Sequence, residues 1–183
     1  MTAVLPLDIA GIQVPDAGPV FLAALAVHVA AAVLAVIAGI LATTARKGPG
    51  HHPRAGTVYL YAIAAVFATA TVMALLRWRH DWHLFIIATI ALGLAILGWT
   101  ARRRRPRRWM LWHGCAMAGS YIALFTGFYV DNGPQLPLWD RAPHLAYWLL
   151  PAAVGAPLTW RALLRNGAIG RRRPENRSIP ERV

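Results

Sequence analysis

Five long apolar segments, nearly free of charged side chains, constrain this chain more than any other feature. They cover residues 20–44, 57–76, 82–100, 109–130 and 143–164. A helix rises about 1.5 Å per residue and the hydrocarbon core of a bilayer is about 30 Å thick, so roughly 20 apolar residues suffice to cross it. Since only helices satisfy their own backbone groups in lipid, the segments predict an all-α integral membrane bundle of five transmembrane helices. Pro151 and Pro157 predict an interruption of the fifth helix.

Composition supports the bilayer as a partner and argues against nucleic acid. The chain is 57% apolar and only 14% charged, which does not suit a solvated surface. Its formal charge of +12 comes from short basic clusters between the apolar segments, not from one basic face of a soluble domain. The single cysteine, Cys115, excludes an intramolecular disulfide and a thiolate metal cluster.

The basic residues predict the orientation of the chain, because cytoplasmic connections carry the excess of Lys and Arg. Sixteen of the nineteen lie on one side, and only Arg77, Arg79 and Arg141 lie on the other. We therefore expect an external segment at 1–19, a transmembrane domain at 20–164, and a basic, disordered cytoplasmic tail at 165–183. The amino terminus is then outside, the carboxyl terminus is inside, and the location is the inner (cell) membrane of a bacterium.

Small residues predict which helix faces meet, because helices in lipid associate by close packing. Three segments carry a stripe of such residues at helical spacing. The first stripe is Ala24, His28, Ala31, Ala35, Ala38 and Ala42; the second is Ala88, Ala91, Ala95 and Gly98; the third is His113, Ala116, Ser120, Ala123 and Gly127. His28 and His113 should therefore point at other helices, where an interhelical hydrogen bond is the simplest role for each.

Histidines on packing faces also suggest a cofactor, since two imidazoles from different helices can hold a haem iron. On the outer side the candidate ligands are His28 and His144, although His28 lies deeper and the pairing requires a tilt or kink. On the cytoplasmic side they are His113 and His52, a weaker pair because His52 is expected in a loop. The expected cofactor is haem b. If the histidines do not bind haem, we expect the chain to have no cofactor.

The segment from His28 to Thr71 resembles an uncharacterised bacterial family of multi-pass membrane proteins, domain of unknown function 2306. The resemblance rests on His28, the turn Lys47–Gly48, the histidine-rich stretch 51–56, and the spacing Gly56 to Tyr59, with a second patch at Arg107, Arg108, Trp109 and Met110. The sequence departs from the family where Pro106 replaces an expected histidine. The resemblance implies a membrane topology and no established reaction.

No hydrolase triad, phosphate loop or paired membrane carboxylate is present, so hydrolysis, kinase chemistry and a carboxylate-based proton relay lack the residues they need. Three other functions remain open. The first is a small redox protein similar to b-type cytochromes, which transfers electrons through haem. The second is a non-enzymatic assembly or accessory subunit that binds other membrane subunits or a second copy of itself. The third is a small transporter, for which an interrupted fifth helix would be the pointer.

Overall fold

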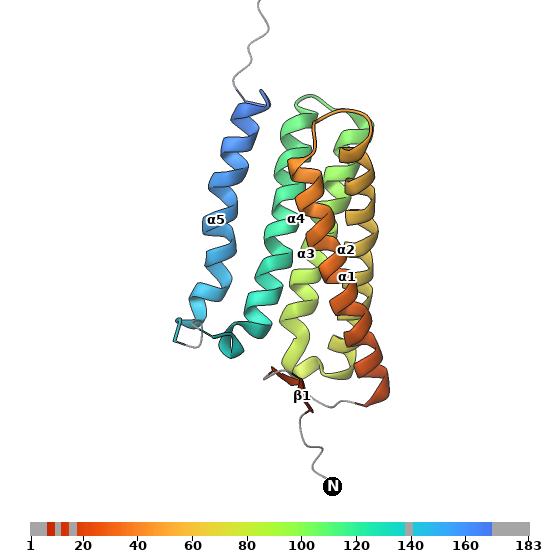
Figure 1. Ribbon diagram of the computed structural model, residues 1–183, viewed down its shortest axis with the longest axis vertical. Helices are drawn as coiled ribbons and strands as arrows, with labels where there is room; N and C mark the ends of the chain where they lie inside the picture. Colours follow the sequence, from red (N-terminus) through yellow and green to blue (C-terminus); the bar gives the residue numbers. More distant parts are fainter. Residues whose placement is uncertain (1–6, 10–11, 15–17, 138–140, 170–183) are drawn as a thin grey trace, which may run out of the picture.

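The computed structural model describes residues 7–9, 12–14, 18–137 and 141–169 of the 183-residue chain. Five long helices dominate it and lie side by side along one axis (Figure 1). They are α1 (Pro19–Thr44), α2 (His51–Leu76), α3 (Trp78–Arg104), α4 (Trp109–Asn132) and α5 (His144–Arg165). The short strands β1 (Leu7–Ile9) and β2 (Ile12–Val14) pair antiparallel before α1, and a 3-10 turn, η1 (Gly133–Gln135), follows α4. The predicted helical bundle is confirmed, whereas the sequence pattern does not predict the hairpin.

Two connections are shorter than the sequence suggests. The sequence predicts a second helix from residue 57, yet α2 begins at His51, so His51 and His52 lie in its first turn. Pro53 permits this because the first backbone N–H groups of a helix need no partner within the helix. The connection from α2 to α3 is Arg77 alone, whose backbone N–H donates to the Met73 and Ala74 carbonyls.

Helix α5 runs without a break from His144 to Arg165, so the predicted interruption at Pro151 and Pro157 is wrong. Each proline removes one backbone N–H from the ladder, yet the chain stays helical on both sides of it. Contacts with α4 hold the helix in place. A Cβ atom at Gly155 would overlap the Ile122 side chain, and one at Gly114 would overlap Leu163.

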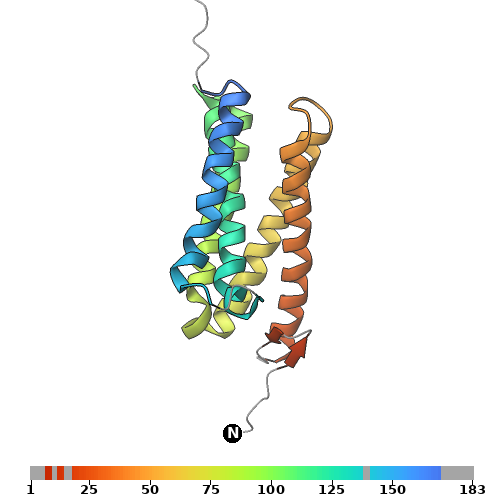
Figure 2. The ribbon, with the colours of Figure 1, turned by 60° about the vertical axis from the view of Figure 1, so that its left-hand side comes forward.

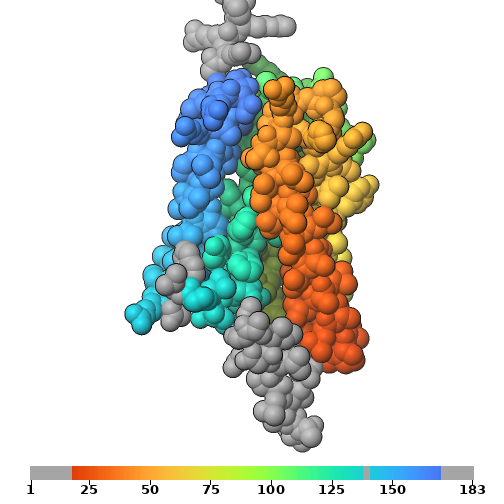
Figure 3. Space-filling view, in the orientation of Figure 1, coloured from red at the N-terminus to blue at the C-terminus, as the bar shows by residue number. Residues whose placement is uncertain are grey.

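Helices that follow one another in sequence also pack against one another, from α1 on α2 to α4 on α5. A smaller contact between α1 and α4 closes the first four helices into a bundle. Helix α5 lies outside this bundle, beside α4 (Figure 2). In the space-filling view the surface of α4 is visible between α5 and α1 (Figure 3).

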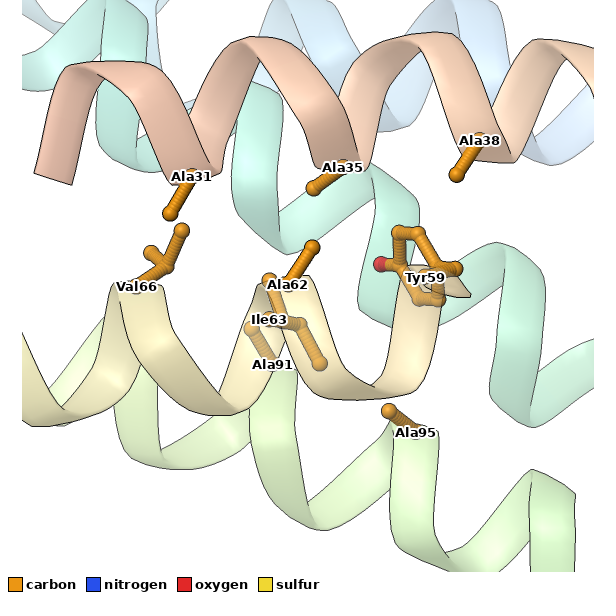
Figure 4. Close-up of a cluster of buried hydrophobic side chains, with 9 residues drawn as sticks. All are labelled: Ala31, Ala35, Ala38, Tyr59, Ala62, Ile63, Val66, Ala91 and Ala95. Carbon is orange, nitrogen blue, oxygen red and sulfur yellow. The ribbon is translucent and has the colours of Figure 1, made fainter. Parts of the chain in front are cut away.

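The core of the bundle lies between α1, α2 and α3 and is built mainly from small side chains (Figure 4). Ala35 and Ala95 are fully buried, and Ala31, Ala38 and Ala91 lie close to them. Ser120 and Ala116 are buried on α4. The three small-residue stripes are therefore confirmed as packing faces at these positions.

Helices α1, α2 and α3 are long and apolar enough to cross a membrane. Many of their large apolar side chains point away from the bundle, among them Val33, Ile37 and Ile90. Such an outward apolar surface is costly in water and favourable in lipid. These features support a membrane protein.

Candidate functional site

Two predicted ligands, His52 and His113, come together at one end of the bundle. This is the end where the α1–α2 and α3–α4 connections lie (Figure 1). The ring centres are 6.2 Å apart, and the ring planes are nearly perpendicular, at 85°. The expectation that His52 belongs to a loop is wrong, because α2 starts one residue before it. Two helices, α2 and α4, therefore hold the pair.

The tautomer of both rings follows from their hydrogen bonds. The Nδ1 atom of His52 lies 2.8 Å from the Ala42 carbonyl oxygen, and that of His113 lies 2.8 Å from the Gly98 carbonyl oxygen. A carbonyl oxygen can only accept, so each Nδ1 carries a proton and donates it. In the neutral imidazole the lone pair then lies on Nε2. A histidine that ligates a metal usually donates its other ring N–H to an oxygen acceptor in this way, which leaves one ring nitrogen free to bind the metal.

The surroundings of the pair are positively charged. Both rings interact electrostatically with Lys47 and Arg102. The ammonium group of Lys47 donates to the Thr43 and Ala42 carbonyl oxygens at the end of α1, at 3.0 and 3.1 Å. Partial burial lowers the pKa of Lys47 from its usual value. A ligand at this end would therefore gain from carrying negative charge.

A layer of two tyrosines lies deeper in the bundle, about two turns from the histidines along α2 and α4. The rings of Tyr59 and Tyr121 are 6.0 Å apart. The Tyr59 hydroxyl lies 2.7 Å from that of Ser120, and the Tyr121 hydroxyl donates to the Val36 carbonyl oxygen at 3.0 Å. The sequence names Tyr59 in the family resemblance and Ser120 in the third stripe, but it does not predict that the two side chains meet.

The outer pair of predicted ligands, His28 and His144, is not brought together. His28 on α1 faces α2, where its Nδ1 lies 3.0 Å from the Thr69 hydroxyl oxygen. That hydroxyl donates to the Ala65 and Val66 carbonyls of its own helix, so His28 is the donor between the two side chains. His144 begins α5, which packs on α4, and its ring lies 6.0 Å from that of Tyr147.

His80 and His83 lie on α3 at the opposite end from His52. The ring of His83 is 6.4 Å from that of Trp148 on α5. No group of three or more His, Cys, Asp or Glu side chains suited to a metal ion occurs among the described residues.

Comparison of the chain with protein-family models, with curated proteins and with solved structures gives no match.

Proposed function

We propose that the chain is a five-span protein of the bacterial inner membrane that binds haem b between His52 and His113. The membrane part rests on α1, α2 and α3, which are long and apolar enough to span. Helices α4 and α5 are the fourth and fifth spans in this proposal, with lengths of 24 and 22 residues. The excess of Lys and Arg at one end supports a cytoplasmic location for that end.

The observation that carries the haem proposal is the pairing of two Nδ1-protonated imidazoles from different helices. Two imidazoles on opposite faces of one metal, with metal–nitrogen bonds of about 2 Å, have ring centres roughly 6 Å apart. The distance between His52 and His113 is 6.2 Å. A haem needs only two protein ligands because the porphyrin supplies the others, which suits a site with two histidines. Two imidazole donors at this distance therefore support haem as the ligand.

The charge of the site supports the same ligand. Haem carries two propionate groups, and Arg102 and Lys47 lie near the pair to offset them. The carbonyls of Ala42 and Gly98 orient the two rings, which raises their strength as ligands. Haem would supply one-electron transfer, and this chain would hold and orient it.

The visible spectrum of the purified protein tests the proposal. The protein is made in cells supplied with a haem precursor, and its spectrum is recorded before and after dithionite. We expect a Soret band that sharpens on reduction, lost in His52→Ala and in His113→Ala. The control, His80→Ala, changes an exposed histidine remote from the pair and should keep the band. A folded, colourless wild-type protein would refute haem binding, and a band lost only in His28→Ala would move the ligand to the outer side.

A second function, the accessory subunit, is favoured by a different observation. His28, His52 and His113 each already have a hydrogen-bond partner on another helix or at its end. Such bonds are sufficient to explain histidines in a membrane bundle. If the purified protein is colourless, the accessory-subunit function is favoured over haem binding. The transporter proposal loses its support, because α5 is continuous.

A further inference from the structure

The last turn of α3 and its connection to α4 carry six arginines between residues 102 and 108, interrupted only by Pro106. The side chains from Arg103 to Arg108 are exposed. Among the described residues the acidic ones are Asp8 on β1, Asp81 in the first turn of α3 and Asp131 in the last turn of α4. Strand β1 and these two helix ends lie at the opposite end of the bundle (Figure 1). The only ion pair in the described chain, Arg77 with Asp81 at 3.6 Å, is also there. The described part of the protein therefore supplies no counter-charge to this arginine cluster.

Two of these arginines are placed beside tryptophan rings. The guanidinium carbon of Arg103 lies 4.2 Å from the Trp99 ring centre, and that of Arg105 lies 5.6 Å from the Trp109 ring centre. Tryptophan in membrane helices concentrates at the level of the lipid headgroups, where the ring is apolar and the N–H is wet. These two contacts therefore place the two guanidinium groups near the level of the lipid headgroups.

Apolar side chains continue from the arginines along the outside of the same helices. Ile96, Leu97 and Met110 are all exposed, within about two turns of the connection. A ligand that satisfies both features has a negatively charged head and an apolar body. A soluble anion or a nucleic acid would use the arginines and leave the apolar surface uncovered.

We propose that Arg103 and Arg105 bind the phosphate of an anionic phospholipid whose acyl chains lie along α3 and α4. Guanidinium groups suit this role because they contact phosphate oxygens in a bidentate manner. Lys47 is not a primary contact, because its ammonium group already donates to two carbonyls. The proposal rests on the membrane embedding proposed above and does not depend on haem.

Lipid-dependent thermal unfolding of the full chain in a neutral detergent tests this site. Phosphatidylglycerol is added in one arm, phosphatidylcholine in a second and inorganic phosphate in a third. We expect phosphatidylglycerol alone to raise Tm, with an apparent affinity that falls roughly tenfold in Arg103→Gln/Arg105→Gln. The control, Arg79→Gln/Arg141→Gln, removes the same charge from exposed positions at the opposite end and should bind as the wild type does.

Other outcomes overturn the proposal. If both double variants respond equally to phosphatidylglycerol, Arg103 and Arg105 are not the lipid-binding site. Stabilisation by inorganic phosphate to the same extent would assign the arginines to a soluble anion. If Arg103→Gln/Arg105→Gln does not fold, added salt provides the test on the wild type, since screening should weaken the phosphatidylglycerol response and leave Tm in phosphatidylcholine unchanged. A response that is insensitive to salt would exclude the charged contact. None of these outcomes depends on the visible spectrum, so the lipid-site proposal and the haem proposal can be refuted independently.

Discussion

The hydroxyl oxygens of Tyr59 on α2 and Ser120 on α4 lie 2.7 Å apart, and both side chains are almost completely buried. The contact joins two helices diagonally across the four-helix bundle. The core around it is otherwise built from alanine and aliphatic groups. A polar bond in such surroundings fixes the rotation of each helix about its axis.

Replacing Tyr59 with Phe should lower the free energy of unfolding by about 1 kcal/mol, the usual value of an interhelical hydrogen bond in a membrane protein. The ring is kept, so packing is preserved and only the bond is lost. Unfolding in mixed micelles with increasing SDS measures the change. The matched control is Tyr61→Phe, since Tyr61 is 73% exposed on the same helix. Equal stability of the two variants would mean that the Ser120 contact contributes nothing.

Replacing Gly98 with Ala should destabilise the bundle by about 1 to 3 kcal/mol, because overpacking forces the neighbouring group to move. The added Cβ would lie 2.8 Å from Cγ of Met117 and 3.3 Å from its backbone nitrogen. A Cβ added at Gly93 on the same helix would meet no atom within 4 Å, so Gly93→Ala should be neutral or slightly stabilising. The same SDS titration compares the two, and a tolerant Gly98→Ala would contradict the close approach of α3 and α4.

Replacing Ala35 with Leu should also cost about 1 to 3 kcal/mol, because Ala35 has no exposed surface and lies between α1 and α2. Ala30→Leu is its control on the exposed face of α1. Thermal unfolding in detergent measures both variants. If the two have the same Tm, the alanine stripe is not a tight interface.

The orientation can be tested with single cysteines in a Cys115→Ala background. Cysteines at Gly48 and Arg107 should resist a membrane-impermeant maleimide in intact cells, and one at Pro134 should react, because basic connections stay in the cytoplasm. All three positions are exposed in connections between helices. Permeabilised cells provide the control, in which every cysteine should react. Labelling of Arg107→Cys but not Pro134→Cys in intact cells would invert the topology.

Much of the fold follows from the sequence because apolar length and small-residue spacing are local signals. Spacing alone predicts the stripe through Ala31, Ala35 and Ala38, and these residues are buried. Helix ends are harder to place. The polar residues from His51 to Arg54 resemble a connection and so suggest a loop, yet helix α2 includes them. Likewise, the two prolines in α5 suggest a break that packing against α4 overrides.

The site is only partly accessible from the sequence. Both His52 and His113 are recognisable as candidate ligands, but ranking the pairs requires knowing which helices are neighbours. Depth along a helix follows from residue count, whereas the position of a helix around the bundle depends on long-range packing. Residue count alone therefore allows a pairing of His28 with His144, although α1 packs on α2 and α5 packs on α4. The contact between Tyr59 and Ser120 depends on the same neighbour relationships.

The order of helix packing has a consequence for synthesis of the chain. Each helix from α2 onward packs against the helix made immediately before it. A growing chain can therefore dock every new helix on a partner that has already left the ribosome, and no apolar helix must wait for a distant segment. The contacts that join an early helix to a late one are those of α4 with α1 and α2, through the hydrogen bond from Tyr121 to Val36 and the contact between Tyr59 and Ser120. Closure of the bundle is then the one assembly step that must await the fourth helix, and α5 can be added to a bundle that is already complete.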